Sequence, residues 1–195
     1  MGTRGHAEIS DAAWRFLHDL RLRGPLPCYE GVRADELLEQ GLVESARDRF
    51  VLTPVGRAVH ARWARAQPGQ ESSAADAAYD AFQSLNERLL RICYDWQITR
   101  GGVPNDHTDF GYDWKVIDRL RSLDASAHAL VSGLAGDMPR FDEYPPRFSH
   151  ALERLEHGHR EWFASPACQS YHTVWMQLHE DLLLATGRSR SDEEA

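Results

Sequence analysis

Residues 37–58 read LLEQGLVESARDRFVLTPVGRA, and this stretch decides the fold of the N-terminal part of the chain. Gly41 can take the left-handed conformation that closes a helix, so a helix is predicted to end just before it. Two short β-forming runs follow, at residues 42–43 and 50–52, and the polar residues between them suit a turn. The stretch therefore predicts a helix end followed by a two-stranded hairpin.

A helix is predicted on each side of this hairpin. Thr53 and Pro54 have the residue types of an N-cap and a first helical residue, because proline lacks only an amide that would be unpaired there. The helix that they begin is expected to bury Val55, Val59 and Trp63. At the other end, Ser10 suits the N-cap of a first helix whose apolar residues recur at helical spacing as far as Gly24.

This order of elements resembles the winged-helix domain of MarR-type bacterial transcriptional regulators. The likeness rests on the Gly-Leu-Val turn, the wing strand and the Leu-Thr-Pro-x-Gly-Arg-Ala helix start, and it covers residues 9–66. It implies a DNA-binding unit. It also implies a homodimer, since regulators of this type read two half-sites with two-fold symmetry.

The sequence lacks some features of the DNA-binding surface that this likeness implies. Pro25 and Pro27 stand where a support helix should lie, so that helix is expected to be shortened or missing. The candidate recognition helix, residues 32–40, carries three acidic side chains, which repel phosphates. The predicted DNA-binding residues are Arg33, Gln40, Arg47 and Arg49. The alternative for the two wing arginines is that they are solvated hairpin charges.

The charge of the chain is unevenly distributed. The 195 residues have a formal net charge of −8, but residues 1–70 contain ten Arg against nine Asp or Glu. Residues 71–195 contain twelve Lys or Arg against twenty-one acidic residues. Because affinity for DNA rests largely on neutralising phosphates, any DNA contact is expected in the first 70 residues.

Length and composition indicate a cytoplasmic globular protein. No apolar run approaches the ~18 residues of a membrane span, and residues 1–6 lack the apolar core of a signal peptide. The three cysteines are isolated and share no Cys-x-x-Cys spacing. This pattern argues against a disulfide framework and against a cysteine zinc site.

The second half of the chain predicts four amphipathic helices. Their apolar stripes begin at Tyr79, Val116, Phe148 and Tyr171, and the third stripe is expected to include Trp162. Helices of this length joined by short loops favour an antiparallel four-helix bundle. The predicted fold is thus mainly α, and its parts are a winged-helix domain (1–66), a linker (67–73), a four-helix bundle (74–187) and a frayed tail (188–195).

This half also resembles the helical region that follows the winged helix in a group of MarR-like bacterial proteins. The likeness is carried by residues 85–86 (LN), 93–97 (CYDWQ), 105–107 (NDH), 170–175 (SYHTVW) and 178–183 (LHEDLL). It implies the same arrangement of domains, but it supplies no active site.

Aromatic and polar residues of these segments are the candidate ligand-binding residues. Helical bundles place ligands between their helices, in pockets with apolar walls and a few polar groups. The predicted set is Asn86, Asp95, Trp96, Tyr171, His172, Trp175 and His179. The alternative is that the polar members hydrogen-bond to one another and fix the register of the helices.

A metal site is a further alternative for the same helices. It would combine His172 and His179 with side chains from Asp95, Asp106, His107 or Asp109. Histidines seven residues apart lie about 10.5 Å apart along a helix axis, whereas ligands on one helix usually come three or four residues apart. Asp109 instead suits a helix cap, and Asn105 and Asp106 suit a turn. No metal ligand and no cofactor is therefore predicted.

The chain lacks local catalytic signatures. It contains no glycine-rich phosphate loop and no Gly-x-Ser-x-Gly elbow, so no catalytic residue is predicted and the chain is not expected to be an enzyme. The predicted function is a transcriptional regulator that contacts DNA through residues 32–50, with a small effector or a protein partner bound by the helical domain. Two alternatives are an adaptor whose winged helix docks another protein, and a small metal-dependent enzyme that uses the His and Asp residues of the helical domain.

Overall fold

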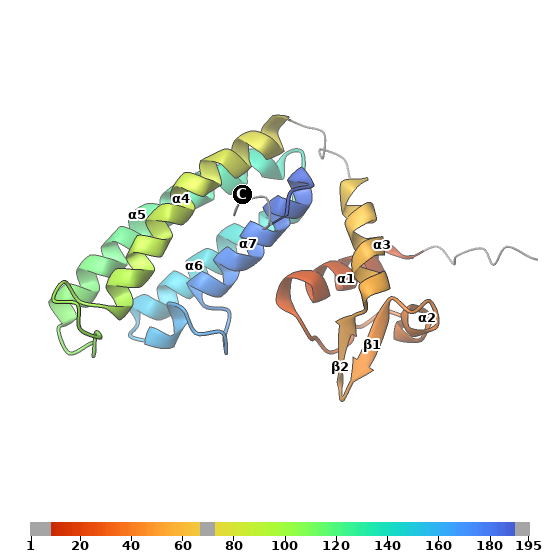
Figure 1. Ribbon diagram of the computed structural model, residues 1–195, viewed down its shortest axis with the longest axis horizontal. Helices are drawn as coiled ribbons and strands as arrows, with labels where there is room; N and C mark the ends of the chain where they lie inside the picture. Colours follow the sequence, from red (N-terminus) through yellow and green to blue (C-terminus); the bar gives the residue numbers. More distant parts are fainter. Residues whose placement is uncertain (1–8, 67–72, 190–195) are drawn as a thin grey trace, which may run out of the picture. The chain divides into compact units, whose positions relative to one another are not determined.

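The computed structural model describes residues 9–66 and 73–189 (Figure 1). The chain divides into two compact units, Met1–Gln67 and Pro68–Ala195. The division falls in the stretch expected as a linker, which lies outside the described residues except for Ser73. Of the expected tail, only residues 188 and 189 are described. The described residues are mainly helical, with one small antiparallel sheet.

The N-terminal unit contains three helices and a hairpin. Their order is α1 (Asp11–Arg23), α2 (Ala34–Glu39), β1 (Val43–Ala46), β2 (Arg49–Leu52) and α3 (Pro54–Arg65). The hydroxyl of Ser10 caps α1 by accepting from the Ala13 amide at 3.3 Å. Gly24 ends the same helix, so the first helix is confirmed at both ends.

The two strands pair as the sequence predicts. Val43 lies opposite Leu52, and Ala46 lies opposite Arg49, which leaves two residues for the turn. Beyond the strands, Leu26 and Phe50 exchange backbone hydrogen bonds of 3.2 and 2.8 Å. The hairpin therefore has a third, one-residue partner that precedes α2 in the chain.

The region expected to hold a helix-turn-helix contains only α2. Within the described residues no helix lies between Gly24 and Arg33, in agreement with the missing support helix. Pro25 and the pairing of Leu26 with β2 keep this segment extended. The recognition helix expected over residues 32–40 is shorter than predicted, since α2 is six residues long.

The predicted closure of α2 at Gly41 is confirmed. Gly41 has a φ of 67°, in the left-handed region. Its amide donates to the Leu38 carbonyl at 2.9 Å, and the Leu42 amide donates to the Leu37 carbonyl at 2.9 Å. These bonds satisfy carbonyls that would otherwise be unpaired at the helix end.

Helix α3 begins as predicted but buries a different face. The Thr53 hydroxyl accepts from the Gly56 amide at 2.9 Å, and Pro54 is the first helical residue. The expectation that Val55 is buried is wrong, because its side chain is 56% exposed. Val59 and Trp63 are half-buried, and the fully buried positions of α3 are Gly56, His60 and Ala64.

The glycine explains this rotation. A Cβ at Gly56 would lie 1.9 Å from the carbonyl oxygen of Leu42, so α3 approaches the chain there more closely than any side chain permits. Trp63 then packs at the edge of the unit, where its ring stacks on Trp14 at a centroid distance of 5.0 Å.

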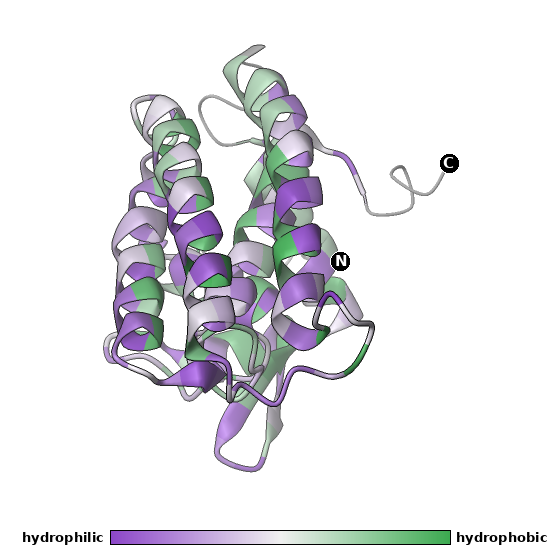
Figure 2. Cartoon of the chain, turned by 90° about the vertical axis from the view of Figure 1, so that its left-hand side faces the viewer, coloured by the Kyte–Doolittle hydropathy of each residue, from purple (hydrophilic) through white to green (hydrophobic). Residues whose placement is uncertain are grey.

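The C-terminal unit consists of four long helices around one core. They are α4 (Ser73–Gln97), α5 (Phe110–Ala135), α6 (Tyr144–Glu156) and α7 (Tyr171–Thr186), with the short helices η1 (Pro139–Glu143) and η2 (Arg160–Trp162). Helix α4 packs against α5 and α7, and α6 packs against the same two helices. Figure 2 shows both apolar and hydrophilic residues around each helix, as expected for amphipathic helices.

The predicted apolar stripes supply most of this core. Tyr79, Val116, Phe148 and Tyr171 are all buried, each on its own helix. The third stripe is an exception, because α6 ends at Glu156 and Trp162 belongs to η2. None of the helices in the described residues combines the length and the apolar character needed to cross a bilayer.

Replacing Gly56 by alanine is expected to destabilise the N-terminal unit. The added methyl group would collide with the Leu42 backbone, which cannot move aside as a flexible side chain would. We expect a loss of about 2 kcal/mol or more in the free energy of unfolding. Hydrogen exchange of backbone amides over a denaturant series, which reports on each unit separately, measures this loss.

Gly133→Ala is the matched control for this variant. A Cβ at Gly133 in α5 meets no atom within 4 Å, and alanine favours a helix interior by up to about 1 kcal/mol relative to glycine. We therefore expect this variant to be as stable as the parent protein or more so. Equal stability of the Gly56→Ala variant and the parent would contradict the close approach of α3.

Candidate functional site

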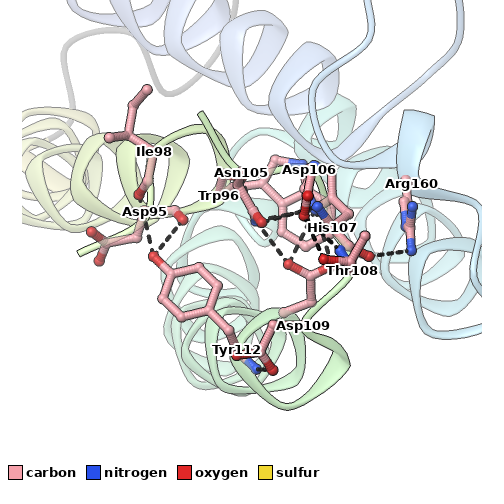
Figure 3. Close-up of polar contacts among 11 residues, drawn as sticks. Asp95, Trp96, Ile98, Asn105, Asp106, His107, Thr108, Asp109, Tyr112 and Arg160 are labelled. Atoms are coloured by element: carbon pink, nitrogen blue, oxygen red, sulfur yellow. Dashed lines mark hydrogen bonds and ion pairs between the residues drawn. The ribbon is translucent and has the colours of Figure 1, made fainter. Parts of the chain in front are cut away.

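A network of hydrogen bonds fixes the loop between α4 and α5 (Figure 3). Ile98 and Pro104 form an isolated β-bridge, which turns the chain back toward the end of α4. The side-chain amide of Asn105 then donates to the Trp96 carbonyl at 3.0 Å and to the Asp113 carboxylate at 2.8 Å. Asn105 thereby joins the end of α4 to the first turns of α5.

His107 lies at the centre of this network. Its Nδ1 lies 3.0 Å from Oδ2 of the buried Asp113, and its ring centroid lies 4.4 Å from that of Trp96. The carbonyl of His107 accepts from Arg160 Nη2 at 2.7 Å. Its φ is 60°, a left-handed conformation that costs a non-glycine residue about 1–3 kcal/mol. These contacts hold the residue in that strained conformation, a situation that is frequent at ligand sites.

The two aspartates beside His107 have the local roles that the sequence predicts. The Asp109 carboxylate caps α5 by accepting from the Tyr112 amide at 3.0 Å. Asp106 accepts from the amide and the hydroxyl of Thr108, and these hydrogen bonds lower the pKa of its carboxyl. Within residues 9–66 and 73–189, no group of three or more His, Cys, Asp or Glu side chains is arranged to hold a metal ion.

A cavity of about 320 Å³ opens beside the loop network. Its buried lining combines the apolar side chains of Trp96, Ile117 and Leu155 with the carboxylate of Asp113, while Phe110 and Trp114 are 68% and 45% exposed. Large apolar side chains exposed around a hollow are typical of binding sites. We call this site the aromatic cavity and define it by Trp96, Phe110, Trp114, Ile117, Leu155 and Arg160.

The aromatic cavity combines fixed aromatic rings with charged side chains. The Trp96 ring is fixed by stacking on Phe163, with a centroid distance of 4.5 Å and an interplanar angle of 2°. The Arg160 guanidinium lies 5.9 Å from the Phe110 ring centroid and supplies a charge at the edge. The lining also includes the carboxylates of Asp113, Glu156 and Glu161, and none of its described residues is a Ser, Thr, Cys, Lys or His.

The seven predicted ligand-binding residues do not surround this cavity or any other single one. Trp96 lines the aromatic cavity, whereas Asp95 forms an ion pair with Arg119 in a separate hollow. Trp175 is fully buried, and its indole nitrogen donates to Asn86 Oδ1 at 2.9 Å. The prediction of one pocket is corrected here, because the Trp175 ring stacks on Phe82 inside the core at 4.9 Å.

The remaining three members belong to the packing of α7. The Tyr171 hydroxyl donates to Asp124 at 3.0 Å, and burial raises the pKa of both groups. His179 is buried against the ring of Phe82, with centroids 4.9 Å apart. His172 is half-buried, and its amide donates to the Phe163 carbonyl at 3.0 Å. These bonds agree with the alternative in which the polar residues fix helix register.

The four predicted DNA-binding residues differ in how accessible they are. Arg33 is exposed but pairs with Glu36 at 2.8 Å. Gln40 is half-buried at the end of α2. Arg47 is exposed at the hairpin turn, with a φ of 59°.

The remaining candidate, Arg49, is held by the fold. Its guanidinium donates to the Pro25 carbonyl at 2.9 Å, although the side chain is exposed. This bond ties β2 to the segment that precedes α2. Of the two wing arginines, Arg47 is therefore the better placed for contact with another molecule.

Sequence reasoning missed most of the aromatic cavity. Phe110, Trp114 and Ile117 are spaced four and three residues apart, so they form a second apolar stripe on α5 beside the one at Val116. The spacing of this second stripe could have indicated the cavity from the sequence. The contribution of Arg160 depends on contacts between distant parts of the chain, so no local sequence pattern predicts it.

The burial of His172 predicts a dependence of stability on pH. Burial lowers the pKa of its imidazole from the ordinary value of 6.5. As the pH falls through 6.5, the unfolded chain takes up a proton that the folded chain binds less readily, so the free energy of unfolding decreases. His172→Gln should lose less stability than the parent between about pH 8 and about pH 5.5 in thermal unfolding. His157→Gln, at an exposed position, is the control; equal losses in both variants would contradict this role of burial.

Comparisons with known proteins add no family to this description. No protein-family model, curated protein or solved structure matches the chain. The likeness to MarR-type regulators therefore remains a resemblance of short motifs, and the proposals below rest on the contacts of the two units.

Proposed function

We propose that this chain is a ligand-responsive regulator of the winged-helix type. The observation that carries the proposal is the paired hairpin between α2 and α3, with Leu26 bridged to β2 in a separate compact unit. This is the element order of a winged helix with a reduced helix-turn-helix. The N-terminal unit acts as the output of the regulator, and the helical unit acts as its sensor.

The sensor is a four-helix bundle that binds a small flat apolar molecule in the aromatic cavity. The proposal is supported by the size of the cavity, about 320 Å³, which lies within the range of ligand pockets. The exposed rings of Phe110 and Trp114 would lose contact with water when a ligand covers them, which favours binding. The same cavity borders the strained loop at His107, whose conformation a ligand can bias.

The aromatic anion 1-anilinonaphthalene-8-sulfonate, a fluorescent dye, is a suitable probe of the aromatic cavity. Trp114→Ala removes one wall and should weaken dye binding about tenfold, since an aromatic side chain contributes about 1.5 kcal/mol or more when buried. Fluorescence titration measures the dissociation constant. Tyr94→Ala, which removes a 60% exposed ring elsewhere on α4, should leave it unchanged. Equal effects of the two variants would rule out the cavity as the binding site.

The output proposed for the N-terminal unit is contact with DNA by a homodimer. Arg47 at the hairpin turn is the exposed cation best placed to reach a phosphate or a minor groove. Arg33 and Gln40 would add contacts from α2. Arg49 would act by holding the hairpin against Pro25.

Arg47→Gln tests this output directly. If the hairpin contacts DNA, this variant should bind the DNA upstream of its own coding sequence more weakly and with a salt slope lower by about one. Electrophoretic mobility shifts at several low salt concentrations measure both quantities. Arg65→Gln, at the far end of α3, is the charge-matched control. Absence of binding by the folded parent protein would end the assignment to DNA.

A second candidate function is a protein adaptor. It is favoured by the charge of residues 32–50, which contain three Arg against five Asp or Glu. A surface of this composition repels phosphates and suits a partner with basic residues. In this case the hairpin and α2 dock another protein, and the DNA experiment above would give no binding at any salt concentration.

A further inference from the structure

Cationic side chains line a groove between α4 and α5. Two cavities of about 230 Å³ each lie there, and both include Arg119 in their lining. We call this surface the cationic groove and define it by Arg88, Arg91, Arg100, Lys115 and Arg119. None of these side chains lines the aromatic cavity.

Three cations of the groove have no ion pair within the described part of the helical unit. Arg91 pairs with Glu87, and Arg119 pairs with Asp95. Arg88, Arg100 and Lys115 form no ion pair within residues 73–189. Every other Lys or Arg of that range has an ion pair, a hydrogen bond or an aromatic ring as a partner: Arg121, Arg140, Arg147, Arg154, Arg160 and Arg188.

This distribution is unusual for an acidic unit. Acidic residues outnumber basic ones in residues 73–189, yet Arg88 lines one of the two adjoining cavities, and Arg100 and Lys115 line the other. The two carboxylates that line the groove already have partners, since Asp95 neutralises Arg119 within the groove and Asp109 caps α5. The charges of Arg88, Arg100 and Lys115 are therefore left for a bound anion to neutralise.

We propose that the cationic groove binds an oligophosphate, a ligand with two or more phosphate groups. Guanidinium groups bind phosphate oxygens in a bidentate manner, and Lys115 adds a point charge. From Gly111 to Ser122, the lining of α5 spans about 16 Å along the helix axis, long enough for several linked phosphates. The site shares no lining residue with the aromatic cavity, and it contains no residue of the hairpin.

Isothermal titration with sodium tripolyphosphate at low salt and without divalent cations tests the proposal on the full chain. The variant is Arg88→Gln, Arg100→Gln and Lys115→Gln combined, and it should bind tripolyphosphate at least tenfold more weakly. These three residues have no ion pair to lose within the described residues, so the variant should keep its fold. An unchanged melting temperature verifies this point.

The control removes the same charge from exposed positions of α3, by Arg57→Gln, Arg62→Gln and Arg65→Gln. It should bind tripolyphosphate as the parent does, and the parent should bind orthophosphate more weakly than tripolyphosphate. Three results would overturn the proposal: no binding by the parent, an equal loss in both triple variants, or groove-dependent binding of duplex DNA without binding of tripolyphosphate.

Discussion

The approach of α3 to Leu42 is the constraint on which the N-terminal unit depends. The Thr53 hydroxyl lies 2.6 Å from the Gly41 carbonyl oxygen and also accepts from the Gly56 amide. The end of α2, the hairpin and the start of α3 are therefore joined within a few residues. With Gly56 against the backbone, α3 has one rotation available, and this rotation decides which of its side chains face solvent. The contact between Gly56 and Leu42 therefore determines which face of α3 is exposed.

The helical unit is fixed differently, by buried polar bonds between residues far apart in sequence. Trp175 bonds to Asn86, and Tyr171 bonds to Asp124. Asp181 is buried and accepts from Arg140 Nε at 2.9 Å. Each bond joins α7 to a different part of the unit, so a shift in register would leave polar groups unsatisfied. This explains why the aromatic and polar residues of α7 form packing contacts and leave the binding surface to α5.

The parts of the structure that the sequence predicts are those decided within a few residues. Caps such as Thr53 and Asp109 act on amides three residues away, and the closure at Gly41 depends on its own φ. The burial of Val55 could not be judged in this way, because the rotation of α3 depends on Leu42. Likewise, the aromatic cavity needs Arg160 to meet Phe110, a contact between residues fifty positions apart. Such contacts depend on which helices pack together, and the pattern of residues within one helix does not show this.

Helix α5 is shared by two surfaces of opposite chemistry. Phe110, Trp114 and Ile117 face the aromatic cavity, while Lys115 and Arg119 face the cationic groove. The same helix thus contributes apolar side chains to one surface and cations to the other. A ligand that shifts α5 when it binds one surface would also change the affinity of the other surface. Linkage makes this influence equal in both directions.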